Sequence, residues 1–154
     1  MTGNLLGNLV RQKGALEYLE LLLEEEFSHL RERHPDEVSR TEMMIHELVR
    51  QVADERLALK ESMNGVRLLD YCDSLDDEVA RPVIELLQRI DDLEQVCSRA
   101  ASRNAELALA LMDQSQKMLE FMHERIQPET RTTYGGRGRY TTHRPQAALL
   151  SGRL

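Results

Sequence analysis

The sequence predicts an all-α protein, an elongated antiparallel bundle of three long helices with left-handed coiled-coil packing. Charged residues make up 31% of the 154 residues and aromatic residues only 4%, a composition typical of helical bundles. Apolar residues recur with a seven-residue period between positions 79 and 121, which indicates a helix about 65 Å long that needs partner helices. Pro and Gly stand where the other two long helices have to end.

The first helix is expected over residues 5–33, with residues 1–4 frayed. Leu21 and Leu22 lie off its main apolar stripe, which indicates burial on a second side. The three consecutive acids from Glu24 to Glu26 point about 100° apart, so we expect a solvated face and not a carboxylate site. The stripe itself consists of Leu9, Leu16, Leu19, Leu23, Phe27 and Leu30.

The second helix is expected to begin near Pro35, because Pro suits a first helical position and disfavours helix at the residue before it. Asn64-Gly65 is its stop signal. The short connection at His34 makes the first two helices antiparallel neighbours. Residues 66–73 are either a continuation or a short fourth helix, and the sequence leaves both open. The stripe of the second helix consists of Val38, Thr41, Ile45, Leu48, Val52, Leu59 and Met63.

The third long helix is expected to end near residue 126. Ser74 and Asp77 have the spacing of a capping box. Pro82 is unfavourable inside a helix, so the regular part should begin near Arg81 or be kinked there. Its seam consists of Val79, Val83, Leu86, Ile90, Leu93, Cys97, Ala100, Asn104, Leu107, Leu111, Gln114, Met118 and Phe121.

Two positions of this seam are polar, Asn104 and Gln114. A polar residue on a coiled-coil seam usually fixes the register at some cost in stability. We favour that role for Asn104 over the alternative that it faces a bound ligand.

The chain should contain two regions, a helical bundle domain over residues 1–126 and a flexible basic tail over residues 127–154. The tail has five Arg and one acid, so residues 1–126 carry a charge of −11 within a chain of −7. An acidic body argues against nucleic-acid binding. The single YGGRGRY segment, from Tyr134 to Tyr140, resembles an RNA-binding repeat, but one copy is a weak signal.

The two cysteines, Cys72 and Cys97, are expected to be free thiols in a cytosolic protein, since they form no CxxC motif. No apolar run is long enough to span a membrane, and the first residues lack the features of a secretory signal. The expected location is therefore the cytoplasm.

Catalysis and metal binding find little support in the sequence. The five His residues are scattered, and neither HExxH nor a phosphate-binding loop occurs. Glu26 with His29, and Glu120 with His123, have the spacing of two halves of a di-metal site, but they read better as exposed helical neighbours. We predict no catalytic residue, no cofactor and no metal.

Methionine is a more informative residue type. Met112, Met118 and Met122 lie beside Phe121 near the end of the third helix, and flexible thioethers suit surfaces that accept varied apolar helices. Residues 147–150 (AALL) add a short apolar patch to the polar tail, as expected of a segment that folds onto a partner.

The order of four segments resembles the FlgN-type flagellar export chaperones along nearly the whole chain. The segments are LEYLELLLEEEFSHL, Glu55 to Lys60 (ERLALK), SRNAELALALM, and a tail with Tyr134, Gly135 and Gly138. The resemblance implies a cytoplasmic chaperone of the flagellar type III secretion system, without enzymatic activity and monomeric or weakly dimeric. It would bind the C-terminal helices of the hook–filament junction proteins FlgK and FlgL, prevent premature assembly and deliver them to the export gate.

The resemblance also implies roles for particular residues. Tyr134 matches a family Tyr that docks on the cytoplasmic domain of the gate protein FlhA, and Tyr140 is a second candidate. We expect the cargo helix to lie along residues 107–122 and the tail, with the contacts Leu107, Leu111, Met118, Phe121, Met122, Leu149 and Leu150. The competing interpretation is a self-associating coiled-coil scaffold or adaptor. An RNA-binding tail and a metal-dependent bundle enzyme rank below it.

Overall fold

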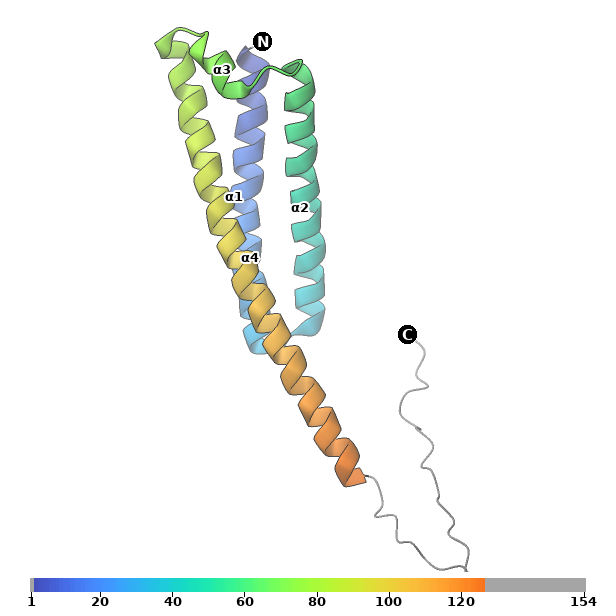
Figure 1. The fold of residues 1–154 in the computed structure, drawn as a ribbon. Helices are drawn as coiled ribbons and strands as arrows, with labels where there is room; N and C mark the ends of the chain where they lie inside the picture. Colours follow the sequence, from blue (N-terminus) through green and yellow to red (C-terminus); the bar gives the residue numbers. More distant parts are fainter. Residues whose placement is uncertain (1, 127–154) are drawn as a thin grey trace, which may run out of the picture. The chain divides into compact units, whose positions relative to one another are not determined.

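The computed structural model describes residues 2–126 and consists of four α-helices joined by short connections (Figure 1). They are α1 (Thr2–Glu32), α2 (Pro35–Ser62), α3 (Leu68–Asp73) and α4 (Asp77–Ile126). No described residue is in a strand, which confirms the all-α class. The structure thus has four helices where three long ones were predicted; α3, with six residues, is the short fourth helix that the sequence left open.

The chain divides into two units, Met1–Leu109 and Ala110–Leu154. The first contains α1, α2, α3 and the part of α4 up to Leu109, and the described part of the second is the rest of α4. The predicted boundary at 126/127 lies at the limit of the described residues and stays a prediction. No helix within residues 2–126 is long and apolar enough to cross a membrane.

The core of the first unit forms where α1, α2 and the first part of α4 lie side by side, with α3 crossing one end (Figure 1). α1 and α2 run antiparallel, as predicted, whereas α1 and α4 run parallel. Cys97 Sγ lies 3.6 Å from the Leu16 carbonyl, and the Asn104 amide donates to the Leu23 carbonyl at 2.7 Å. Both pairs have the same sequence offset and lie seven residues apart, so α1 and α4 keep one register over that interval. The most deeply buried side chains are Leu9, Leu22, Leu93 and Val83.

The predicted turns at the ends of α2 are confirmed. Pro35 is the first residue of α2, and Asn64 and Gly65 both have positive φ (49° and 83°) just after the helix ends. Gly tolerates that conformation without a steric penalty, which makes it a natural helix stop.

One predicted helix start is wrong, and for another, one of the two alternatives is wrong. α1 begins at Thr2, so residues 2–4 are helical and not frayed. α4 begins at Asp77, because the Asp76 carbonyl accepts the first helical hydrogen bonds, so of the two alternatives the start near Arg81 is wrong and the kink at Pro82 stays a prediction. Pro82 therefore lies in the second turn of α4, where its missing N–H removes a single bond to the preceding turn.

The predicted capping box at Ser74 does not form. The Ser74 hydroxyl donates to the Tyr71 carbonyl at 2.6 Å, and Ser74 is the C-cap of α3. This hydroxyl closes the end of the short helix and is not available to the start of α4.

The acidic run on α1 is only partly solvated. Glu24 and Glu25 are exposed as expected, but Glu26 is 9% exposed, so the predicted solvated face is wrong at that position. Glu26 lies seven residues after the buried Leu19, which places it on the core side of α1. Of the two leucines off the main stripe, Leu22 is 1% exposed and Leu21 is 61% exposed, so of these two only Leu22 is buried as expected.

Candidate partner-binding surface on α4

The seam of α4 changes character along its length. From Val83 to Asn104 its residues are buried or half-buried, with the core of the first unit around them. Leu107 and Leu111 are half-buried, and Met118 and Phe121 are each 55% exposed. The apolar seam of α4 is therefore buried up to Asn104 and exposed to solvent at Met118 and Phe121.

Asn104 is the last buried residue of α4. It is 2% exposed, and its amide donates to the Leu23 carbonyl and to Glu26 Oε2, both at 2.7 Å. Arg103 reinforces the same level of α1, because its guanidinium donates to Glu24 at 3.0 Å and lies 3.8 Å from the Phe27 ring centroid. These contacts suit a residue that fixes the register of α4 on α1, and the amide nitrogen of Asn104 already donates two hydrogen bonds within the protein.

Residues 110–126 form a strongly amphipathic helical segment. With 100° of rotation per residue, its apolar side chains cover about half of the helix circumference. The exposed apolar face consists of Met112, Met118, Leu119, Phe121, Met122 and Ile126, with Leu111 half-buried between them. We call these seven residues the α4 apolar face.

The opposite side of this segment carries charged and amide side chains. Lys117 Nζ lies 2.8 Å from the Asp113 carboxylate, and Gln116 donates to Glu120 at 3.2 Å. Such exposed pairs four residues apart support a helix weakly, by about 0.3–0.5 kcal/mol each. The polar side is therefore satisfied within its own helix, whereas the α4 apolar face remains in contact with solvent.

The chemistry of the α4 apolar face suits a helical partner. Three of its residues are Met, whose flexible and polarisable side chains adapt to irregular apolar surfaces. The Arg125 guanidinium lies 4.8 Å from the Phe121 ring centroid, which places one positive charge beside an aromatic residue of the face. Contiguous exposed apolar side chains of this kind mark interaction sites more often than single exposed ones do.

The structure brings part of the predicted cargo site together. Met118, Phe121 and Met122 lie on the α4 apolar face, and Met122 is 49% exposed. Leu111 is half-buried on the same face, while Leu107 belongs to the first unit and is half-buried there. Four predicted residues lie outside the described part of the chain, namely Leu149 and Leu150 for cargo and Tyr134 and Tyr140 for the export gate.

Sequence reasoning missed Leu119 and Ile126. Both are more than 60% exposed on the α4 apolar face, but neither falls on the heptad seam. A seven-residue period selects only a narrow stripe, whereas the full 3.6-residue period of a straight helix would have included them.

A second surface feature lies within the first unit. A groove of about 510 Å³ runs between α2 and α4 near the loop after α2, and Leu9, Leu59, Leu87 and Ile90 form its apolar floor. Arg56 of α2 and Glu94 of α4 form an ion pair beside it. The groove was not predicted, because it arises from the packing of helices far apart in the sequence.

Neither thiol is activated, and Glu26, one acid of the di-metal spacing that the sequence contains, already has a protein partner. Cys72 and Cys97 are free and buried, and burial raises the pKa of both thiols, so neither is an activated nucleophile. The Glu26 carboxylate accepts a hydrogen bond from Asn104, which occupies one half of the di-metal pattern. Within residues 2–126, the donor groups close enough to share an ion are His29, Glu32 and His34 at the α1–α2 turn.

Comparison with known families gives one match. A family model described as FlgN protein matches residues 1–142, which is most of the chain. Comparisons with curated proteins and with solved structures gave no match.

Proposed function

Because the chain belongs to the FlgN family of flagellar export chaperones, we propose that it holds the C-terminal helices of the junction proteins FlgK and FlgL on the α4 apolar face. The exposure of this face carries the proposal. The core of the first unit is closed around α1, α2 and the start of α4, yet the last turns of α4 keep apolar side chains in solvent. Helices with an apolar side bind to such faces through side chains spaced three or four residues apart.

Cargo binding at this face would keep the junction proteins from assembling prematurely, which is the task of a chaperone of this kind. The junction proteins would otherwise pack their amphipathic terminal helices against one another, and the α4 apolar face offers a substitute partner. Met112, Met118 and Met122 can adjust to two different cargo helices. The chaperone then prevents premature assembly without ATP, because binding alone keeps the cargo surface covered.

The C-terminal residues complete the proposal. Leu149 and Leu150 would add to cargo binding, and Tyr134, with Tyr140 as the second candidate, would dock on the cytoplasmic domain of FlhA at the export gate. The proposed site of action is the cytoplasm, and the proposed boundary between bundle and tail remains at 126/127. The free protein would be a monomer or weak dimer.

The test is co-elution with light scattering of the full chain and purified junction protein. A variant with Met118, Phe121 and Met122 all replaced by Ala should bind about 100-fold more weakly, since each truncated anchor costs about 1 kcal/mol or more. The matched control replaces Asp113, Lys117 and Glu120 by Ala on the opposite side of the same turns and should bind normally. A chain ending at Ile126 measures the contribution of the tail.

Three results would change the proposal. Unchanged affinity of the apolar variant would remove the site from α4. Equal weakening of both variants would indicate a loss of helix and not of contacts, which circular dichroism would detect. A large homo-oligomer without any cargo complex would favour the self-associating scaffold.

A further inference from the structure

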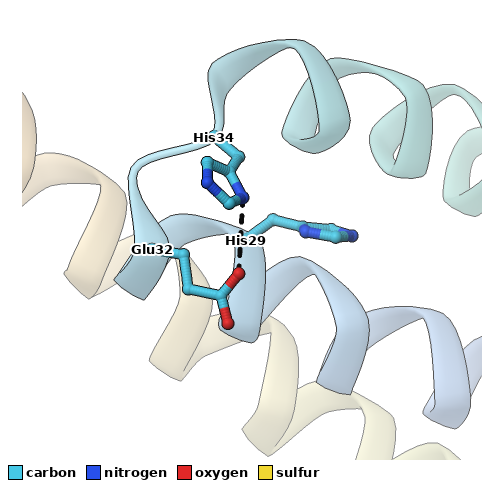
Figure 2. Close-up of side chains that lie close together, drawn as sticks. All are labelled: His29, Glu32 and His34. Atoms are coloured by element: carbon cyan, nitrogen blue, oxygen red, sulfur yellow. Dashed lines mark ion pairs between the residues drawn. The ribbon is translucent and has the colours of Figure 1, made fainter.

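The α1–α2 turn brings two imidazoles and a carboxylate together from three positions close in sequence. The donor atoms of His29, Glu32 and His34 all lie within 4.8 Å of one another. His34 Nδ1 is 3.3 Å from Glu32 Oε2, and Figure 2 shows these two side chains facing each other, with the His29 ring extending to one side. The cluster lies on the surface, where Glu32 and His34 are exposed and His29 is half-buried.

The backbone of the turn holds this arrangement. Arg33 has a positive φ of 59°, which reverses the chain directly after α1. The His34 N–H donates to the His29 carbonyl at 3.0 Å, and the His34 carbonyl accepts from Val38 N–H at 3.0 Å. The backbone of His34 is therefore hydrogen-bonded both to the last turn of α1 and to the first turn of α2, so its position relative to the backbone of His29 is fixed.

His29 has an unused polar atom at this place. Its Nδ1 is buried and has no hydrogen-bond partner in the structure. A buried polar atom without a partner costs free energy, and most such atoms in proteins are satisfied by protein, water or an ion. This observation is independent of the short distances within the cluster.

We propose that His29, Glu32 and His34 bind a divalent d-block ion, with Zn²⁺ as the preferred one. Two His and one Glu form a known zinc ligand set that leaves a fourth position open for water. Ligand bonds of about 2.1 Å at tetrahedral angles place donor atoms about 3.4 Å apart. The Glu32–His34 separation of 3.3 Å already matches that length, and the remaining separations must close by at most about 1.4 Å from the 4.8 Å limit.

We expect rotation of the side chains to close that gap. The His29 imidazole turns about its own torsions, which exchange between staggered rotamers at small cost. The bound ion would then connect the end of α1 to the start of α2. It would act on the hairpin and not on the α4 apolar face, so this proposal does not depend on the proposed cargo site.

The experiment is a zinc titration of the full chain, prepared without a histidine tag, in competition with a chromophoric chelator. One Zn²⁺ per chain is expected, and Co²⁺ should give the visible spectrum of a four-coordinate site. His34→Gln and Glu32→Gln should each weaken binding at least tenfold. His46→Gln, which changes an exposed His elsewhere on α2, is the matched control and should leave affinity unchanged.

Thermal unfolding gives a second measurement. With free Zn²⁺ at about one hundred times its Kd, the ratio of folded to unfolded chain rises about 100-fold, which raises Tm by about 8 °C. This rise should persist in His46→Gln and disappear in His34→Gln. The proposal is overturned if the wild-type chain binds no stoichiometric zinc, or if His34→Gln and His46→Gln weaken binding equally.

Discussion

Asn104 makes the most specific polar contact between α1 and α4, and replacing it with Ala tests whether it fixes their register. The substitution removes two hydrogen bonds of 2.7 Å, one to the Leu23 carbonyl and one to the Glu26 carboxylate. A neutral bond contributes about 1 kcal/mol and a bond to a charged group about 1.5–3 kcal/mol. Because Glu26 is only 9% exposed and would lose the hydrogen bond that the Asn104 amide donates to it, we expect Asn104→Ala to lower the free energy of unfolding by about 3 kcal/mol.

The assay is equilibrium urea denaturation of the full chain, followed by helical circular dichroism. Glu24→Ala is the matched control, since it removes the Arg103–Glu24 ion pair that joins the same two helices at the surface and should cost at most about 1 kcal/mol. The double variant Asn104→Leu with Glu26→Leu should be more stable than the sum of the two single changes predicts, because it leaves neither partner unpaired. A loss below about 1 kcal/mol for Asn104→Ala, or strictly additive effects with Glu26, would refute the reasoning.

Three further predictions concern stability and reactivity in the first unit. Hydrogen bonding from Arg11 lowers the pKa of Glu55, so Glu55→Gln should lower the free energy of unfolding near pH 7. This effect should shrink as the pH falls below about 4, because the native carboxylate then becomes protonated. Urea midpoints of both chains across this pH range measure the change. Burial raises the pKa of Cys97, so a thiol reagent at about pH 8 should modify it slowly in the native chain and rapidly in urea. Leu22→Ala should lower the free energy of unfolding by about 3 kcal/mol, because Leu22 is buried. The adjacent Leu21→Ala should change it by no more than about 0.5 kcal/mol, because Leu21 is exposed. Equal urea midpoints for the two variants would contradict the assigned buried face of α1.

The helices were largely predictable because their signals are local. Pro35 and Asn64-Gly65 act through backbone geometry within one turn, and the structure places helix ends at both. Pro82 suggested a start near Arg81, which is wrong, because an interior Pro costs less in the second turn of a helix, where one hydrogen bond is lost. The prediction for Glu26 was wrong because a run of acids suggests a solvated face. The burial of Glu26 depends instead on its hydrogen bond with Asn104 of α4, which is a tertiary contact.

The candidate site was predictable only in part. The heptad pattern identified Met118 and Phe121 as apolar positions, but a pattern on one helix cannot say whether another helix covers it. Leu119 and Ile126 add to the same face outside the heptad stripe. The sequence pattern pairs His29 with Glu26, three residues before it. In the structure, the metal-ligand atoms that lie near His29 belong to Glu32 and His34 at the turn. That proximity depends on the chain reversal at Arg33, which no periodic pattern contains.

The lengths of the helices connect the fold to the function. α4 has 50 residues and α1 and α2 have 31 and 28, or about 75 Å against 47 and 42 Å at 1.5 Å per residue. Neither shorter helix alone can cover the seam of α4 along its full length. The sequence nevertheless keeps Met118, Phe121 and Met122 on α4 after the buried part ends at Asn104. A contiguous exposed apolar face is an aggregation hazard unless a partner covers it, so these exposed apolar side chains favour a function that requires binding to another protein.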